Sequence, residues 1–191
     1  MFDELIIRAM PELVKFFRSL NMSFYFTKDQ VKNFKAFVVA MMMKGFSGKM
    51  SDVADLTRYS HRTSFGRFLD SPAWDEEWLI TAINRHVLQK IWGVARQTKE
   101  PIYVIIDDTI CEKALPSSKA ESPIYGCSFH KSHLKNKTVY GHQFVGCMLR
   151  VGDLVLPYKI VLYEKLKEPS KTKSKIAIAQ EIVASLPTPP P

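Results

Sequence analysis

The fold depends on one stretch, Pro101-Ile102-Tyr103-Val104-Ile105-Ile106-Asp107-Asp108-Thr109, in which a continuous apolar run ends in two adjacent carboxylates. A run of this length predicts a buried central strand. Neighbouring residues of a strand point to opposite faces, so only one of Asp107 and Asp108 can face a given pocket. A carboxylate at a strand end is well placed to hold a divalent cation such as Mg²⁺. The alternative is that both acids cap the following turn and lie in water.

The segments that follow predict an antiparallel hairpin and a helix. Residues 112–137 form a long polar excursion, after which residues 139–151 predict a second strand. The turn signal Gly152-Asp153 separates this strand from a third over residues 154–163, so the pair should form a hairpin. A basic connection then leads to an amphipathic helix over residues 174–186.

The chain before Pro101 has a different character, because its apolar residues recur at helical spacing and Gly and Pro are sparse. We therefore expect an α+β protein with a helical bundle in residues 1–98, which could bind DNA, and a sheet-containing domain in residues 99–191. Thr27 and Gln30 predict a capping box. The expected segments are a helix over 5–17, one over 27–43 ending at Gly45, one over 52–56 capped by Ser51, one over 62–69, one over 74–92, and a linker over 93–100.

The composition narrows the classes of partner and compartment. The chain holds 27 Lys and Arg against 19 Asp and Glu, a formal net charge of +8, which favours polyanionic partners such as nucleic acid or an anionic membrane surface. Three widely spaced cysteines do not resemble a disulfide framework and fit a reducing compartment. The longest apolar run, residues 36–43, is shorter than a membrane span. We expect a cytoplasmic protein without a membrane partner.

Two sets of basic residues are candidates for contact with DNA. Two short helices around a break at residues 59–61 suggest a helix-turn-helix, in which Arg58, Arg62 and Arg67 would reach bases and phosphates. The same arginines could instead form the solvated face of a small bundle. The polar excursion ends in a basic loop whose Lys131, Lys135 and Lys137 could neutralise phosphates.

The same loop raises the alternative of a zinc site. Cys127, His130 and His133 supply only three of the four ligands that a structural zinc site needs, so the spacing argues against one. His142, in the second expected strand, could approach the carboxylates from the neighbouring strand or serve as a structural histidine.

Four motifs resemble, in their order and spacing, the start of the catalytic domain of DDE transposases of the IS4-like and IS701-like insertion-sequence groups. The upstream helices are similar to the helical region that precedes that domain in these groups. The motifs are Ile105-Ile106-Asp107-Asp108-Thr109, Glu112-Lys113, Tyr140-Gly141-His142-Gln143-Phe144-Val145 and Leu156-Pro157-Tyr158-Lys159-Ile160.

This resemblance implies a ribonuclease-H-like fold, which opens with three antiparallel strands, a helix and then a fourth strand beside the first. It implies that Asp107, in the pattern Asp-x-Thr with Thr109, is the first catalytic carboxylate and a metal ligand, with Asp108 as the fallback. The implied chemistry is phosphoryl transfer on DNA with two Mg²⁺ or Mn²⁺ ions. The second Asp and the Glu of the family have no match here.

We therefore expect an N-terminal transposase fragment that acts in DNA transposition but is inactive alone, with its first strand left unpaired along one edge. Its expected partners are insertion-sequence ends and full-length transposase. The main alternative is a non-catalytic DNA-binding or regulatory remnant of an insertion sequence. A protein with no role on DNA is the third possibility.

Overall fold

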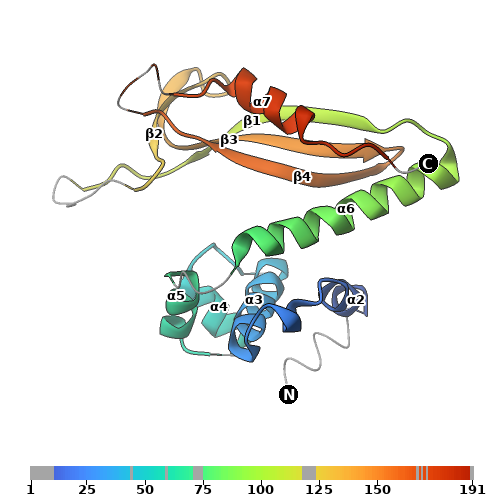
Figure 1. Ribbon diagram of the computed structural model, residues 1–191. Helices are drawn as coiled ribbons and strands as arrows, with labels where there is room; N and C mark the ends of the chain where they lie inside the picture. Colours follow the sequence, from blue (N-terminus) through green and yellow to red (C-terminus); the bar gives the residue numbers. More distant parts are fainter. Residues whose placement is uncertain are drawn as a thin grey trace. The chain divides into compact units, whose positions relative to one another are not determined.

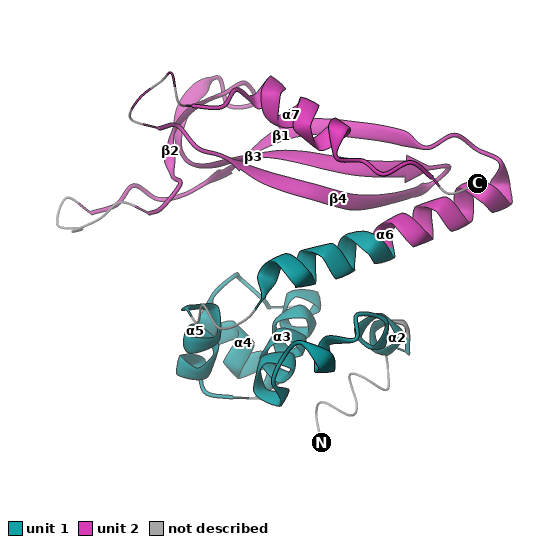
Figure 2. Cartoon of the chain, viewed as in Figure 1, with its two compact units in different colours: residues 1–86 teal, residues 87–191 magenta. Residues whose placement is uncertain are grey.

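The computed structural model describes residues 11–43, 45–58, 60–70, 75–117, 124–166, 168, 170 and 172–189 (Figure 1). The chain divides into two compact units, residues 1–86 and 87–191 (Figure 2), and each is described by itself. Several expected features lie outside the described residues. They are the helix start at Leu5, Ile6 and Ala9, the break at Tyr59, the helix stop at Ser71-Pro72, the helix start at Trp74, and the end of the terminal proline run.

The first unit is helical, as its apolar periodicity predicts. Its elements are α2 (Pro11–Ser19), the 3-10 helix η1 (Met22–Phe24), α3 (Lys28–Met42), α4 (Met50–Thr57), α5 (Arg62–Asp70) and the first part of α6 (Glu76–Thr98). The predicted capping box is confirmed at the start of α3. There the backbone N–H of Gln30 donates to Thr27 Oγ1 at 3.3 Å, and that of Thr27 donates to Gln30 Oε1 at 2.8 Å.

Two apolar clusters hold this unit together. Leu20, Met22, Phe26 and Leu79 form one, and Ala36, Ala40, Val53 and Phe65 form the other. Val53, Ala40 and Phe65 are completely buried, so the second cluster ties α3, α4 and α5 into one core.

Several helix boundaries differ from the prediction; for example, α3 ends at Met42 rather than at Gly45. Ser51 does not cap α4, which begins at Met50; the carboxylate of Asp52 instead accepts hydrogen bonds from the backbone N–H groups of Ser47 and Lys49, at 2.7 and 3.3 Å. The linker predicted from Gly93 is also wrong, because α6 continues to Thr98. A glycine in a helix interior lowers the stability of the helix by only about 1 kcal/mol relative to alanine. The residues on either side of Gly93 offset this loss, and the helix continues.

The second unit contains one antiparallel sheet and a helix. Its elements besides the end of α6 are β1 (Tyr103–Glu112), β2 (Ser128–Ser132), β3 (Lys137–Val151), β4 (Leu154–Tyr163) and α7 (Lys175–Ala184). The β3–β4 hairpin and the helix after it are confirmed. Gly152 turns the hairpin with a positive φ of 54°, and Ser174 Oγ caps α7 by accepting from the backbone N–H of Ala177 at 3.1 Å.

Strand β3 is the shared member of this sheet. It pairs with β1 through residues 141–150, with β4 through residues 143–151, and with β2 through residues 137–141. Since β1 and β4 pair with the same part of β3, they lie on opposite sides of it, and Gly141 has partners in both β1 and β2. Helix α7 contacts β3 and β4, and it lies over one face of the sheet (Figure 1).

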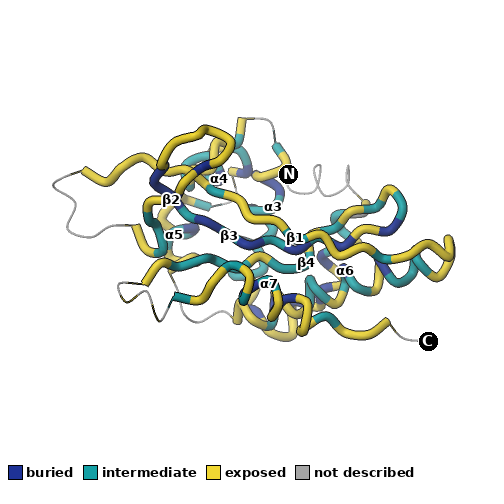
Figure 3. The backbone as a smooth tube through the Cα atoms, turned by 90° about the horizontal axis from the view of Figure 1, so that it is seen from above, coloured by how far each residue is buried: buried dark blue, intermediate teal, exposed yellow. Residues whose placement is uncertain are grey.

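The prediction that the run of residues 101–109 forms a buried central strand is wrong. Among the described residues β1 pairs only with β3, so it is an edge strand, and most of its residues are exposed. Figure 3 shows the contrast between the exposed β1 and the buried β3. An apolar run indicates a strand, but burial requires neighbours on both sides, and those belong to β3. The unpaired edge of β1 agrees with the expectation, drawn from the transposase resemblance, that the first strand lacks a partner along one edge.

Strand β2 was not predicted at all. Its five residues, Ser128 to Ser132, include one apolar side chain, Phe129, and belong to a segment rich in Ser and Lys, a composition typical of a loop. It forms because the turn over residues 133–136, in which Asn136 has a positive φ of 47°, folds it back onto the start of β3.

Gly141 provides the first test of this sheet. A Cβ atom at this position would collide with the backbone oxygen of Cys111 and lie 2.9 Å from the Cα of Glu112. We expect Gly141→Ala to lower the melting temperature sharply, because the backbone of β1 cannot yield as a flexible side chain would. Gly93→Ala, in open space within α6 of the same unit, should be neutral or stabilising by up to about 1 kcal/mol. Equal effects in thermal unfolding would contradict the close approach of β1 to β3.

Candidate functional site

The two adjacent carboxylates lie on different faces of the sheet. In the register of β1 with β3, Asp108 lies opposite Val145 and Asp107 opposite Gly146. Residues directly opposite in an antiparallel pair point to the same face, so Asp108 shares the face of the buried Val145. This is the face that α7 covers, because Lys175 at the start of α7 contacts Asp108.

Asp108 is held by two donors. Lys175 Nζ donates to Asp108 Oδ2 at 2.9 Å, and the side-chain amide Nε2 of Gln143 donates to the same oxygen. The hydrogen bond from Lys175 is the main reason that the pKa of Asp108 lies below its usual range, and the bond from Gln143 lowers it further against the opposing effect of burial. Gln143 is only 5% exposed, so removing Asp108 would take a hydrogen-bond partner from a buried amide.

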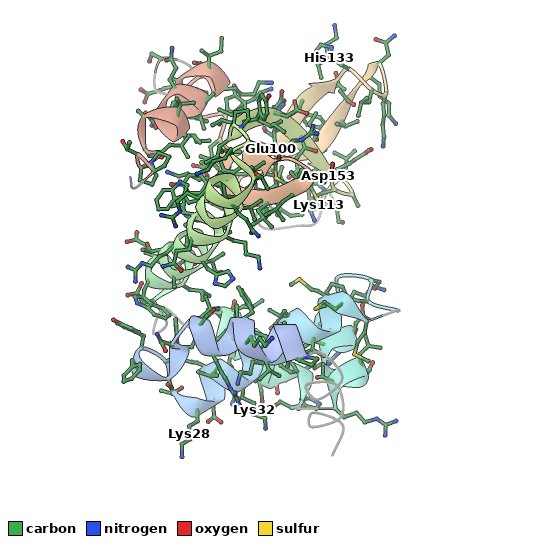
Figure 4. All side chains as sticks on the ribbon, turned by 90° about the vertical axis from the view of Figure 1, so that its right-hand side faces the viewer. Lys28, Lys32, Glu100, Lys113, His133 and Asp153 are labelled. Carbon is green, nitrogen blue, oxygen red and sulfur yellow. The ribbon has the colours of Figure 1, made fainter. Side chains whose placement is uncertain are left out.

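Asp107 makes a different contact. Its Oδ1 accepts a hydrogen bond from the backbone N–H of Asp108 at 2.8 Å. Together the two aspartates line one side of a cleft of about 400 Å³. The other side is the β2–β3 hairpin, which contributes Lys131, His133 and Lys135; His133 lies at the outer tip of this hairpin (Figure 4).

The structure therefore brings part of the expected basic loop to the carboxylates. Lys131 and Lys135 line the same cleft as Asp107 and Asp108, and Lys135 forms an ion pair with Glu112 at the end of β1. The hydrogen bond from Lys135 is the largest cause of a lowered pKa at Glu112, with the charge of Lys137 a smaller one. The cleft thus carries acidic groups on β1 and basic groups on the β2–β3 hairpin.

A buried histidine lies on the α7 side of this hairpin. His130 pairs in register with Val139, is 2% exposed, and its Nε2 lies 2.8 Å from Ser128 Oγ. Burial lowers the pKa of His130, and the charge of Lys165 lowers it further. His130 is therefore neutral near pH 7 and acts as part of the core.

The three arginines expected to contact DNA belong to the first unit. Arg58 follows α4 in the left-handed conformation, with φ of 51°, while Arg62 begins α5 and Arg67 lies in its last turn. All three are exposed. Helices α4 and α5 contact each other and are separated by a short break, as a helix-turn-helix requires, but solvated helix faces have the same exposure.

The zinc alternative finds no support in the geometry. Cys127 Sγ lies 3.4 Å from Nε2 of His142, while Nε2 of His130 lies 2.8 Å from Ser128 Oγ. Nε2 of His142 also lies 2.8 Å from the backbone oxygen of Tyr125, which gives this histidine a structural role. Within the described part of the chain, no group of three or more His, Cys, Asp or Glu side chains is arranged to hold a metal ion.

Two residues of this site were not singled out from the sequence, Gln143 and Lys175. A signal for each was present. Gln143 lies two residues before Val145 in the strand, so alternation places it on the same face as Asp108. Lys175 follows Ser174, a strong capping residue, and therefore begins α7. What the sequence could not show was the register that brings both to one carboxylate oxygen.

The described residues do not by themselves fit a two-metal centre. Asp107 and Asp108 point to opposite faces, and Asp108 is already neutralised by Lys175. Two ions held at fixed positions require several carboxylates that converge.

The comparisons with known proteins bring no relative: no family model matches the chain, and neither the curated proteins nor the solved structures contain a match. A separate finding concerns membranes. None of the helices in the described ranges combines the length and the apolar character that crossing a bilayer requires.

The Asp108–Lys175 pair can be tested by a double-mutant cycle with Asp108→Asn and Lys175→Met. Both side chains are about 40% exposed, so solvent screens the pair and we expect a small but measurable coupling energy, between about 0.2 and 1 kcal/mol, in urea unfolding at neutral pH. The more exposed Lys173–Glu181 pair serves as the matched control and should couple less strongly. No coupling between Asp108 and Lys175 would mean that they do not meet in solution.

His130 predicts a specific dependence of stability on pH. Because its pKa is lowered in the folded protein, the unfolded chain binds more protons, and stability must fall as the pH drops below the ordinary imidazole value of 6.5. We expect His130→Gln to reduce this slope between about pH 7 and 5 in chemical unfolding, since the titrating group is gone. His133→Gln, at an exposed position, should keep the wild-type slope. An unchanged slope in His130→Gln would show that His130 is not buried.

Proposed function

We propose that the chain is the N-terminal part of a DDE transposase, in which a ribonuclease-H-like domain carries out metal-dependent cleavage and transfer of DNA strands. One observation carries the proposal. The first strand bears the Asp107-Asp108 pair, and after the short strand β2 come the antiparallel β3–β4 hairpin and the covering helix α7. Apart from β2, which the resemblance does not include, this order of elements and carboxylates is what the motif resemblance implies. The proposal includes a cytoplasmic location.

The proposal assigns the first catalytic carboxylate to the Asp107-Asp108 pair. The Asp-x-Thr pattern favours Asp107, whereas the contacts favour Asp108, because Gln143 and Lys175 fix the position of its side chain. An ordered carboxylate is better placed to orient a ligand than one that must be immobilised on binding.

The described residues supply only this part of a catalytic centre. Mg²⁺ or Mn²⁺ would need further carboxylates that converge on the same position, and these residues do not provide them. We therefore propose that the chain alone does not catalyse strand transfer and that activity would depend on residues equivalent to the second Asp and the Glu of the family.

A second candidate is a non-catalytic DNA-binding or regulatory remnant of an insertion sequence. The observation that favours it is the pairing of Asp108 with Lys175 and of Glu112 with Lys135, which leaves the cleft suited to contacts rather than to metal chemistry. Its partners would be insertion-sequence ends or a full-length transposase.

Reading the genomic DNA past codon 191 in all three frames separates the two candidates. The catalytic proposal expects a strand-like run that ends in Asp, followed later by a helix that carries Glu. Unrelated sequence in every frame would contradict the catalytic proposal and leave the remnant.

Contact with DNA through the β2–β3 hairpin can be measured with a labelled insertion-sequence-end duplex. We expect the triple variant Lys131→Gln, Lys135→Gln and Lys137→Gln to weaken binding. It should also reduce the slope of log K against log salt by about one for each phosphate group that the variant no longer neutralises. Fluorescence anisotropy over a series of salt concentrations gives both quantities.

The matched control removes the same charge elsewhere in the second unit, through Lys90→Gln, Arg96→Gln and Lys99→Gln at exposed positions of α6 and its end. This control should keep the wild-type slope. Equally weakened binding in both triple variants would show that only net charge matters, and salt-independent binding would contradict phosphate contact altogether.

A further inference from the structure

The first unit contains a cleft that shares no residue with the cleft at Asp107 and Asp108. We call it the α2–α3 cleft, because residues of α2, of η1 with the turn before it, and of α3 line it. Figure 1 shows how η1 joins the two helices. The cleft has a volume of about 550 Å³, within the range of about 300 to 1,000 Å³ that is usual for sites that bind small molecules.

The charged side chains that line the α2–α3 cleft are cationic. They are Arg18, in the last turn of α2, and Lys35, on α3, and the described lining residues include no Asp or Glu. No carboxylate of the described residues pairs with either cation. The cleft therefore carries two positive charges that the described part of the chain does not neutralise.

The ammonium group of Lys35 is held at the cleft by an aromatic ring. Lys35 Nζ lies 5.6 Å from the centroid of the Phe17 ring, within the distance of a cation–π interaction. Phe17 is only 5% exposed, and its ring packs edge-on against Phe34 with 6.0 Å between the centroids. The ring is thus fixed in the core of the unit, and it keeps the charge of Lys35 beside the cleft.

The floor of the α2–α3 cleft is apolar. Phe17 and Met22 are buried, and Val31 is half-buried. Asn21 adds an uncharged polar side chain, and its left-handed conformation, with φ of 51°, turns the chain from α2 into η1. An apolar floor beside two cations is complementary to a molecule that has an apolar body and a negatively charged group.

We infer that the α2–α3 cleft binds a small amphiphilic anion, in which a carboxylate, sulfonate or phosphate monoester is joined to an apolar body. The anionic group pairs with Arg18 and Lys35, and the guanidinium can bond two of its oxygens at once. The apolar body packs against the floor. The phosphates of a DNA duplex would meet the two cations without covering this floor, so the site does not depend on the proposed action on DNA.

Fluorescence titration of the full chain with anilinonaphthalene sulfonate, an aromatic anion, tests the inference. We expect saturable binding to one site per chain. The double variant Arg18→Gln, Lys35→Gln should weaken it at least about tenfold, because hydrogen bonds between charged groups are lost. Phenylnaphthylamine has the same apolar body without the sulfonate, and its affinity should change little.

The matched control is the double variant Lys49→Gln, Arg85→Gln, which removes the same charge at exposed positions of the first unit outside the cleft. It should keep the wild-type affinity for the sulfonate. Phenyl phosphate should displace the sulfonate, whereas inorganic phosphate at equal concentration and ionic strength should not. Circular dichroism confirms that the variants are folded, and shifted NMR signals of the Val31 methyl groups locate the probe.

The inference is overturned if the wild-type chain shows no saturable binding, or if the cleft variant binds the sulfonate as tightly as the wild type does. An equal loss of affinity in the control variant, or for phenylnaphthylamine, would show that the cleft does not recognise the anionic group. Displacement by inorganic phosphate alone would show that the apolar floor plays no part. Unshifted Val31 signals would place the probe elsewhere.

Discussion

The backbone hydrogen bonds of β3 are the constraint on which the second unit depends. Every other strand of the described sheet is bonded to this one strand, so the position of each is defined by its register with β3. Its alternating side chains bury Val145, Cys147, Leu149 and Val151 on the face that carries α7. Gly141 permits β1 to approach closely where a side chain would not fit. Strand pairing and core packing therefore specify the same register.

The environment of Asp108 follows from that register. Because Asp108 lies opposite Val145, its side chain meets Gln143 from β3 and Lys175 from the start of α7, residues far from it in the sequence. Asp107, one residue earlier, is directed to the other face and bonds locally to the backbone of Asp108. The sheet thus gives two adjacent, chemically identical residues different surroundings, and it leaves the free edge of β1 beside both.

Local signals predicted most of the elements, whereas long-range relations were predicted less well. Thr27 with Gln30 and Gly152 with Asp153 act through neighbours in the sequence, so the α3 cap and the β3–β4 hairpin could be predicted from their residues alone. The buried position assigned to β1 failed because an apolar run does not reveal how many strands flank it. Strand β2 was missed because its pairing partner, not its composition, makes it a strand. Likewise Lys131 and Lys135 were predicted as a basic loop, but their place beside Asp107 and Asp108 depends on that hairpin.

Amide hydrogen exchange along β1, followed residue by residue by NMR, tests the central claim most directly. If β1 is an edge strand held by β3 alone, its amides should alternate: those directed toward β3 exchange slowly, and those directed away exchange quickly. Uniform protection from Tyr103 to Glu112 would mean that β1 is an inner strand, and uniformly fast exchange would mean that it does not pair with β3; either result would contradict the account.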